Sequence, residues 1–321
     1  MKAAVVKAAG ERPVYADFES PNALAGHRLI DVAASALSHV TRSKASGSHY
    51  SSTGGFPFVA GLDGTGRCED GRRVYFFWPH APFGAMAERS LVPEENCVPL
   101  PDGIDDVTAA AIAIPAMSSW AALIERARFV AGETVLVNGA TGTSGRLAVQ
   151  IAKHLGAGKI VATGRDAATL QSLEYAGADV TISLEQDEDL LSRAFESQFR
   201  EGVDVVLDYL WGASARSLLI AAARASAEDG PVRFVQIGAI SGADILLPAA
   251  VLRAAPITLL GSGIGSIPLP RVLHTMQQVF DAAVPAGLRI ATEAVPLADV
   301  GTHWGNLSSL QRTVFIPRRY D

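Results

Sequence analysis

The sequence has few cysteines and no excess of positive charge. Only Cys68 and Cys97 occur among 321 residues, which excludes a disulfide-rich scaffold and a four-cysteine zinc site. Two isolated cysteines are typical of a reducing compartment. Lysine and arginine number 27 against 33 aspartates and glutamates, and the net charge of −6 argues against a nucleic-acid groove or a surface for anionic lipid. We therefore expect a cytoplasmic protein that binds neither nucleic acid nor membrane.

The sequence also offers no secretory signal, and one uncharged run needs a separate check. Residues 1–7 are too short for the apolar part of a signal peptide. Residues 107–124 have the length of a membrane span. Alanine dominates this run, however, and Pro115, Ser118 and Ser119 interrupt it, so its transfer into lipid is poor. We expect a pair of buried helices here and a soluble protein.

What is present is the composition of a globular chain of about two domains. Hydrophobic residues make up 49%, and the 30 glycines and 17 prolines show no collagen-like period. In the first third of the chain, short apolar runs alternate with glycine and proline, which predicts an irregular β-rich unit. The strands expected there are residues 2–7, 28–36, 73–78 and 87–92, with turns at Gly54, Gly55, Gly61, Gly64, Gly66 and Gly71.

From about residue 105 the pattern changes to strands that alternate with helices. Residues 134–138 form a continuous apolar run of the kind that is buried on both faces of a parallel sheet. Residues 145–155 follow with apolar side chains at helical spacing. The series predicts a doubly wound, six-stranded α/β sheet. Its strands are expected at 134–138, 159–163, 180–182, 203–208, 232–237 and 257–261, followed by a helix at 270–283 and short strands at 291–296 and 313–316.

Three glycines mark the turn from the first of these strands into its helix. The segment reads Gly-Ala-Thr-Gly-Thr-Ser-Gly. Glycine allows a tight turn, close approach of a pyrophosphate and close packing of helix on strand, and the helix N-terminus offers N–H groups to phosphates. The alternative is a structural glycine turn in another kind of α/β protein. We predict a dinucleotide site that includes Gly139, Ala140, Thr141, Gly142, Thr143, Ser144 and Gly145.

The end of the second strand distinguishes NAD from NADP. NAD-binding proteins place an acidic residue there to hold the ribose 2′-hydroxyl. This chain has Gly164 and then Arg165, whose guanidinium matches a 2′-phosphate. Asp166 is the counter-argument, although it lies past the position expected for a carboxylate that holds the ribose. A solvated surface pair of Arg165 and Asp166 is the other alternative. We expect NADP(H) as the cofactor.

Motifs for a metal or for a serine nucleophile are absent. The seven histidines show no HxxxH spacing, and the two cysteines show no CxxC spacing. His39, Asp63 and Cys68 are a conceivable ligand set, but we expect no metal. No GxSxG motif occurs, which disfavours a serine hydrolase.

Further motifs surround the glycine turn. Residues 56–66 look like P-x-x-x-G-x-E-x-x-G, residues 84–103 like G-A-Y-A-E…V-P…L-P-D-G, and residues 116–120 stand in the place of G-L-T-A-W. The glycine turn is similar to the motif A-x-G-G-V-G, and residues 207–209 are similar to a V-L-D motif at the end of a later strand. With these motifs the chain resembles, over nearly its whole length, the medium-chain dehydrogenase/reductase superfamily in its zinc-independent quinone-oxidoreductase-like branch.

The resemblance implies a fold, an activity and an assembly. It implies a GroES-like catalytic domain (1–125 and 263–321) and a Rossmann domain that binds NADP (126–262). It also implies hydride transfer from NADPH to quinones or α,β-unsaturated carbonyls, and a homodimer that pairs residues 257–261 across a two-fold axis. Further cofactor contacts are implied for Ser118, Gly164, Arg165, Asp208, Gly238, Gly261, Ser262 and Gly263.

Departures from the family pattern bear on catalysis. Zinc-dependent relatives have a cysteine where this chain reads Ala-Leu-Ser-His at 36–39 and a His-Glu pair where it has Leu62 and Asp63, which supports a zinc-free site. The resemblance implies Tyr50 and Ser38 as donors to the developing oxyanion, with solvent as the other proton source. Two other functions stay open: an NADPH-binding sensor or structural protein with little turnover, and an alcohol dehydrogenase-like enzyme.

Overall fold

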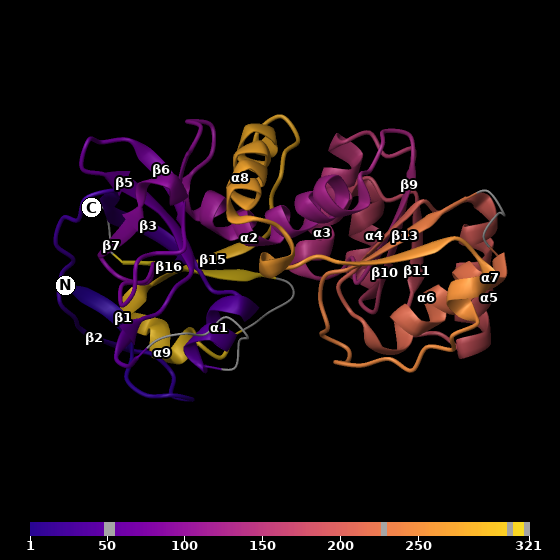
Figure 1. Ribbon diagram of the computed structural model, residues 1–321, viewed down its shortest axis with the longest axis horizontal. Coiled ribbons are helices and arrows are strands. Elements are labelled where there is room, and N and C mark those ends of the chain that lie inside the picture. Colours follow the sequence, from indigo (N-terminus) through magenta and orange to yellow (C-terminus); the bar gives the residue numbers. More distant parts are fainter. Residues whose placement is uncertain (48–54, 226–229, 307–310, 318–321) are drawn as a thin grey trace. The chain divides into compact units, whose positions relative to one another are not determined.

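The computed structural model describes residues 1–47, 55–225, 230–306 and 311–317 (Figure 1). Contacts within the chain define two compact units. Unit 1 comprises Met1–Ile114, Met276–Pro285 and Arg289–Asp321, and unit 2 comprises Pro115–Thr275 and Ala286–Leu288. The domain ranges drawn from the sequence, 1–125 with 263–321 and 126–262, remain a prediction.

Unit 1 is built mainly from antiparallel strands. Its larger sheet runs β15-β16-β3-β5-β6-β8, with β7 also paired to β3, and its smaller sheet runs β2-β1-β4. The short helices α1 (His39–Ala45) and α9 (Val300–His303) belong to the same unit. The strands are β1 (Lys2–Val6), β2 (Val14–Asp17), β3 (His27–Ala36), β4 (Phe58–Val59), β5 (Asp63–Cys68), β6 (Arg73–Phe77), β7 (Arg89–Pro93), β8 (Cys97–Pro99), β15 (Thr292–Pro296) and β16 (Arg312–Ile316).

Strand β5 corrects one prediction. Turns were expected at Gly64 and Gly66, but both glycines lie inside β5, between β3 and β6. A Cβ on Gly64 would come within 2.8 Å of the carbonyl oxygen of Ala34, and one on Gly66 within 2.4 Å of that of Asp31. Glycine is therefore required because β3 and β5 approach closely, and the chain does not reverse there.

Unit 2 contains the predicted six-stranded parallel sheet, in the order β11-β10-β9-β12-β13-β14. The first strand of the series, β9, lies in the middle of the sheet between β10 and β12, so the strand order reverses there. The predicted α/β class, with a six-stranded parallel sheet and a separate β-rich unit, is confirmed. The strands are β9 (Thr134–Asn138), β10 (Lys159–Gly164), β11 (Val180–Ser183), β12 (Val205–Asp208), β13 (Val232–Gln236) and β14 (Ile257–Gly261).

Helices between these strands complete the core of unit 2. The central strands β9 and β12 are buried along most of their length, because side chains from helices cover the sheet. Phe195 and Phe199 from α5 pack with Phe234 of β13 in one buried cluster. The helices are α3 (Thr143–His154), α4 (Ala167–Ala176), α5 (Glu188–Glu201), α6 (Gly212–Ala225) and α7 (Val251–Ala254), and α8 (Leu269–Ala283) follows β14.

The apolar run at 107–124 forms one continuous helix, so the predicted helix pair is wrong. Helix α2 (Asp106–Ala121) runs through Pro115 and continues as the π-helical turn Ala122–Ala127. The carbonyl of Pro115 accepts hydrogen bonds from the hydroxyls of Ser118 and Ser119 at 2.8 and 3.0 Å. Asp106–Ala127 is the one described segment apolar and long enough to cross a membrane, but 72% of its most apolar stretch is buried. This burial is typical of a core helix in a soluble protein.

Candidate cofactor site

Almost all the predicted cofactor residues lie at the carboxyl edge of the six-stranded sheet. Parallel strands end at the same edge, and sheets of this kind bind ligands where the strand order reverses, here between β9 and β12. The exception is Ser118, which lies on α2. Three of the others are the last residues of their strands: Gly164 of β10, Asp208 of β12 and Gly261 of β14. The rest lie in the segments that follow a strand: 139–145 after β9, Arg165 after β10, Gly238 after β13, and Ser262 and Gly263 after β14.

Two of the three loop glycines are required by packing. Gly139 has a positive φ of 90°, and a Cβ there would lie 2.8 Å from Cγ of Leu210 in the loop after β12. A Cβ on Gly145 would lie 2.3 Å from the carbonyl oxygen of Gly139 and 2.6 Å from Cα of Ala140. Backbone atoms cannot move aside as a side chain can. Gly145 thus lets α3 pack directly on the turn that precedes it.

Gly142 is different because its surroundings are open. Its φ of −77° and ψ of 167° are accessible to any L-residue. The nearest atom to a Cβ on Gly142 would be the carbonyl oxygen of Gly139, at an ordinary contact distance of 3.6 Å. Neither backbone strain nor packing explains this glycine. The N-cap position favours glycine over alanine, and the close approach of a ligand to this backbone remains the prediction from the sequence.

The N-terminus of α3 is suited to an anion. Gly142 is its N-cap and supplies no side-chain hydrogen bond, and the first turn carries no acidic residue. The first N–H groups of a helix lack partners within the helix, and they carry the positive end of its dipole. A phosphate placed there would accept hydrogen bonds from these groups.

Arg146 adds a positive charge to the same turn, and sequence reasoning missed it. Its Nε donates to the carbonyl oxygen of Thr141 at 3.0 Å. Burial lowers the pKa of Arg146, and the nearby carboxylate of Asp166 opposes this shift. A cation in the first turn is repelled by the helix dipole, whereas an anionic ligand would be attracted by both. The signal in the sequence was an arginine directly after the third glycine.

Asp166, the carboxylate that could have favoured NAD by holding the ribose 2′-hydroxyl, has a structural role. It is the N-cap of α4, and its Oδ1 accepts a hydrogen bond from the backbone N–H of Thr169 at 2.7 Å. This bond holds the pKa of Asp166 below its ordinary value. The neighbouring Arg165 is exposed and forms no ion pair with any described residue. The available group at the end of β10 is therefore the guanidinium.

Asp208, at the end of β12, accepts hydrogen bonds from β9 and from the loop that follows β12. Its Oδ1 accepts hydrogen bonds from Nδ2 of Asn138 at 2.8 Å and from the backbone N–H groups of Leu210 and Trp211, both at 3.1 Å. Burial raises the pKa of Asp208, and these hydrogen bonds oppose the shift. The hydroxyl of Thr163 donates to Oδ1 of Asn138 at 2.8 Å, which ties β10 to β9 and β12. A direct contact between Asp208 and a cofactor remains a prediction.

The remaining predicted residues also make internal contacts. A Cβ on Gly238 would lie 2.6 Å from the carbonyl oxygen of Tyr209, so this glycine lets the loops after β12 and β13 meet. Ser119, next to Ser118, shares a 2.7 Å hydrogen bond with the hydroxyl of Tyr209. The backbone N–H of Ser262 donates to the carbonyl of Gln236, that of Gly263 donates to Oγ of Ser266, and the carbonyl of Gly261 accepts from Nε of Arg126.

The two predicted proton donors are not tested by this geometry. Ser38 is buried at the N-cap of α1, where its Oγ accepts from the backbone N–H of Thr41 at 3.0 Å and lies 2.8 Å from that residue's hydroxyl. Tyr50 lies outside the described residues. Both assignments remain predictions.

Asp63, a conceivable metal ligand by its sequence context, is a buried acid. The hydroxyl of Tyr75 donates to its Oδ2 at 3.1 Å. Burial raises the pKa of Asp63 to about 7, and the positive charge of Arg312 opposes the shift. No group of three His, Cys, Asp or Glu side chains in the described ranges lies close enough together to hold a metal ion.

Comparison with known proteins agrees with this geometry. A family model described as "Zinc-binding dehydrogenase" matches residues 145–283. A "Probable NADPH-dependent quinone reductase" of Emericella nidulans is 28% identical, covering 95% of this chain and 96% of that protein. The quinone oxidoreductase of Thermus thermophilus, whose structures include a complex with NADPH, has a TM-score of 0.81 at 25% identity and covers 98% of this chain. The same match covers 100% of the Thermus thermophilus chain. These similarities support the medium-chain dehydrogenase/reductase superfamily, which the sequence motifs resemble.

Relatives named as quinone oxidoreductases support the quinone-oxidoreductase-like branch that the sequence motifs resemble. A quinone oxidoreductase of Pseudomonas aeruginosa is 31% identical over 58% of this chain and 61% of that protein. The family match spans residues 145–283, a range that includes strands β10 to β14 of the parallel sheet.

Proposed function

We propose that this protein is an NADPH-dependent oxidoreductase that reduces quinones or α,β-unsaturated carbonyls without zinc. The single observation that carries cofactor binding is the open N-cap Gly142, where no side chain caps α3 and the strand order reverses. The names of the relatives from Emericella nidulans and Pseudomonas aeruginosa support quinones as the substrate class.

Each half of the dinucleotide has a set of residues to hold it. The backbone N–H groups that follow Gly142, in Thr143 and Ser144, would bind the pyrophosphate. Arg165 would bind the 2′-phosphate, with Arg146 near the adjacent Asp166 as a second cation, because a guanidinium forms charge-assisted hydrogen bonds with phosphate oxygens. Ser118, Gly238, Gly261, Ser262 and Gly263 would line the nicotinamide half.

The chemistry asked of the protein itself is modest. When bound, NADPH supplies hydride from its nicotinamide C4, and the protein must orient the acceptor and exclude water. In a quinone or enone the arriving charge is delocalised onto a remote oxygen. The Lewis acid that would help to polarise a simple carbonyl is therefore not required. The oxygen still needs a hydrogen-bond donor. We assign this role to Tyr50, with Ser38 as the second candidate and solvent as the fallback.

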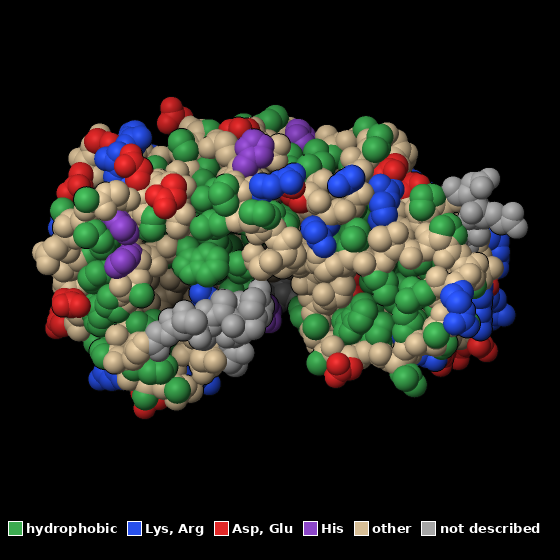
Figure 2. Space-filling view, viewed as in Figure 1, with side chains coloured by type: hydrophobic (Ala, Val, Ile, Leu, Met, Phe, Trp, Pro, Cys, Tyr) green, Lys and Arg blue, Asp and Glu red, His purple; other side chains and the backbone are tan. Residues whose placement is uncertain are grey.

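We propose further that the protein is a cytoplasmic homodimer. Strand β14 is an edge of the parallel sheet, carries no charged residue and exposes Leu259. An uncharged apolar edge strand is a template for pairing with a second copy. Figure 2 shows hydrophobic side chains gathered on the surface of unit 2 around α6. Exposed apolar residues in the chain between β13 and β14 include Ile240, Leu246 and Leu252.

The test is NADPH oxidation by the purified protein with a panel of quinones and enones. Steady turnover, with a primary isotope effect in single-turnover reactions of C4-deuterated NADPH, is the expected result. Tight NADPH binding without turnover on any acceptor would replace the proposal with a sensor or structural role. Failure to bind NADPH would refute the assignment of the cofactor site itself.

A further inference from the structure

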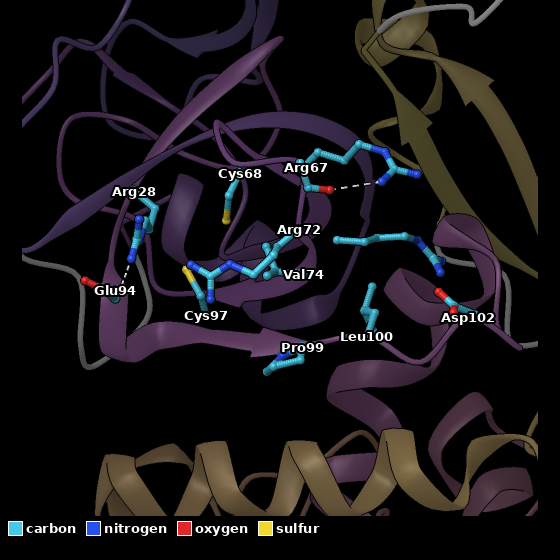
Figure 3. Close-up of a pocket in the computed structure, with 12 residues that line it drawn as sticks. Arg28, Arg67, Cys68, Arg72, Val74, Glu94, Cys97, Pro99, Leu100 and Asp102 are labelled. Carbon is cyan, nitrogen blue, oxygen red and sulfur yellow. Dashed lines mark hydrogen bonds and ion pairs between the residues drawn. The ribbon is translucent and has the colours of Figure 1, made fainter.

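Unit 1 contains a cavity that the proposed reaction does not use. Its volume is about 370 Å³, and both cysteines of the chain line it (Figure 3). Arginines crowd the same cavity, among them Arg28 and Arg72, which form ion pairs with Glu94 and Asp70. On their cavity side the two thiols therefore have guanidinium groups nearby, which an ordinary cysteine buried among apolar side chains lacks.

The two cysteines come from different strands but meet. Cys68 ends β5 and Cys97 begins β8, two strands that flank β6. Both pack on one buried cluster, which includes Val74 and Phe76. Both line the same cavity, and in Figure 3 their side chains project into the same space. Sγ of Cys97 also lies 3.7 Å from the carbonyl oxygen of Pro93.

The two thiols are not equivalent. A hydrogen bond from Cys97 lowers the pKa of Cys68 to about 7; burial and Asp70 oppose this shift, while Arg72 and Arg28 add to it. The same hydrogen bond raises the pKa of Cys97, since Cys97 is the donor to the charged sulfur. A thiolate is the nucleophilic form of cysteine. The arrangement therefore pairs an attacking thiolate, Cys68, with a neighbouring thiol that can resolve its oxidised form.

Access is provided by Cys97. Cys68 is buried, with 6% of its surface exposed, whereas Cys97 is half-buried and opens onto the cavity. A cavity of about 370 Å³ is several times the roughly 30 Å³ that one water occupies in the liquid, so a molecule the size of hydrogen peroxide fits.

We propose that Cys68 and Cys97 form a thiol–disulfide redox site that is oxidised by small hydroperoxides. The Cys68 thiolate attacks one oxygen of the peroxide, the O–O bond breaks, and the departing oxygen takes up a proton, which leaves a sulfenic acid on Cys68. The Cys97 sulfur then attacks the Cys68 sulfur, the S–O bond breaks, and water departs with the Cys97 proton. The sum is two thiols and one hydrogen peroxide giving one disulfide and two waters.

The resulting disulfide would join β5 to β8 and close the loop formed by residues 69–96. A cross-link of this kind restricts the unfolded chain and so stabilises unit 1. Oxidation would leave the carboxyl edge of the sheet in unit 2 untouched. The site is therefore separate from the proposed reductase activity, and its test does not depend on that activity.

The experiment treats the full native protein with hydrogen peroxide, blocks remaining thiols with N-ethylmaleimide and measures the intact mass. We expect the loss of two hydrogen atoms, no maleimide adduct, a peptide that links Cys68 to Cys97, and reversal by dithiothreitol. Recovery of two maleimide adducts after peroxide treatment would overturn the proposal. A disulfide between two copies of the chain would overturn it as well.

Variants separate the two roles. In Cys97→Ser, Cys68 should stop at the sulfenic acid and be trapped by dimedone; in Cys68→Ser, oxidation of Cys97 should slow at least tenfold. Oxidation of Cys97 at the wild-type rate in Cys68→Ser would refute the assignment of the attacking thiol.

One variant leaves both cysteines in place, in case a cysteine variant does not fold. Arg72→Gln should slow disulfide formation severalfold. Arg200→Gln, which alters an exposed arginine on α5 in unit 2, is the matched control and should not change the rate. Equal rates in the two arginine variants would remove the electrostatic part of the argument.

Discussion

Replacing two glycines of the same loop with alanine should impair two different properties: the stability of the fold at Gly145 and the affinity for NADPH at Gly142. At Gly145 the new Cβ would lie 2.3 Å from a backbone oxygen and 2.6 Å from a backbone carbon, well inside van der Waals contact. Either α3 moves off the turn or the turn opens. Overpacking of this kind costs about 1–3 kcal/mol. Alanine's better helix propensity returns up to about 1 kcal/mol. A net loss of stability of about 1–2 kcal/mol is expected for Gly145→Ala.

At Gly142 the same change should leave the fold nearly intact. The backbone there is compatible with alanine, and the nearest contact of the new Cβ is 3.6 Å. Replacing a glycine in a compatible conformation gains about 0.4–1 kcal/mol through the unfolded chain. Loss of a favourable N-cap residue costs a similar amount. We expect a stability change within about 1 kcal/mol and a weakening of NADPH binding by about tenfold or more, because the methyl group occupies the space that the pyrophosphate would approach.

The assay pairs urea unfolding with calorimetric titration of NADPH for both variants. Stability should fall in Gly145→Ala, whereas cofactor affinity should fall in Gly142→Ala with little change in stability. If Gly142→Ala binds NADPH as tightly as the parent, then the open space at Gly142 is not a phosphate site, and the reasoning that identifies the cofactor loop fails. If Gly142→Ala instead unfolds like Gly145→Ala, the glycine serves packing and carries no information about a ligand.

Four further predictions address the remaining assignments. Arg165→Ala should weaken NADPH by about tenfold to a hundredfold, equivalent to about 1.4–2.7 kcal/mol, and leave NADH nearly unchanged in fluorescence titrations; equal weakening of both cofactors would remove Arg165 from the 2′-phosphate site. Tyr50→Phe should lower kcat about tenfold without a change in NADPH affinity, and a wild-type kcat would exclude Tyr50 as the donor. Treatment with EDTA or phenanthroline should leave NADPH oxidation unchanged, and a loss restored by zinc would contradict the zinc-free site. Burial raises the pKa of Asp63 from 3.8 to about 7, so the folded protein favours the protonated carboxyl. The stability that this gives is complete below about pH 3.8 and is lost as the pH rises through about 7. In Asp63→Asn, the fall of the urea midpoint between about pH 4 and 8 should therefore be smaller.

The parallel sheet could be predicted because its strands leave a simple pattern. A strand covered on both faces is apolar at most positions, which makes the run Thr134–Asn138 visible without any partner. The apolar run Ile257–Gly261 is as visible in the sequence, although it forms the exposed edge strand β14. The predicted bounds of these two strands agree with the structure. The glycines that follow β9 could also be placed, because a turn into a helix has a recognisable sequence.

The β-rich unit could not be predicted to the same degree. Strand β5 reads Asp-Gly-Thr-Gly-Arg-Cys, a composition typical of a turn, and only the close approach of β3 explains its glycines. Helix α1 is a short segment with few apolar residues, and its Ser38 cap becomes informative only when Thr41 is known to lie one turn away. Such features depend on tertiary neighbours that are distant in the sequence.

The candidate site shows the same division between local and distant causes. Identical glycines serve different purposes at the carboxyl edge of the sheet: Gly145 and Gly238 are required because backbone atoms lie less than 3 Å from where a Cβ would be, while nothing lies within 4 Å of that position at Gly261. No sequence pattern separates these cases. Once the packing is known, the glycines that packing does not explain become the informative ones. Gly142, at the N-terminus of α3, and Gly261, at the end of β14, are two positions at this edge where packing does not require a glycine, and we propose that an approaching ligand accounts for both.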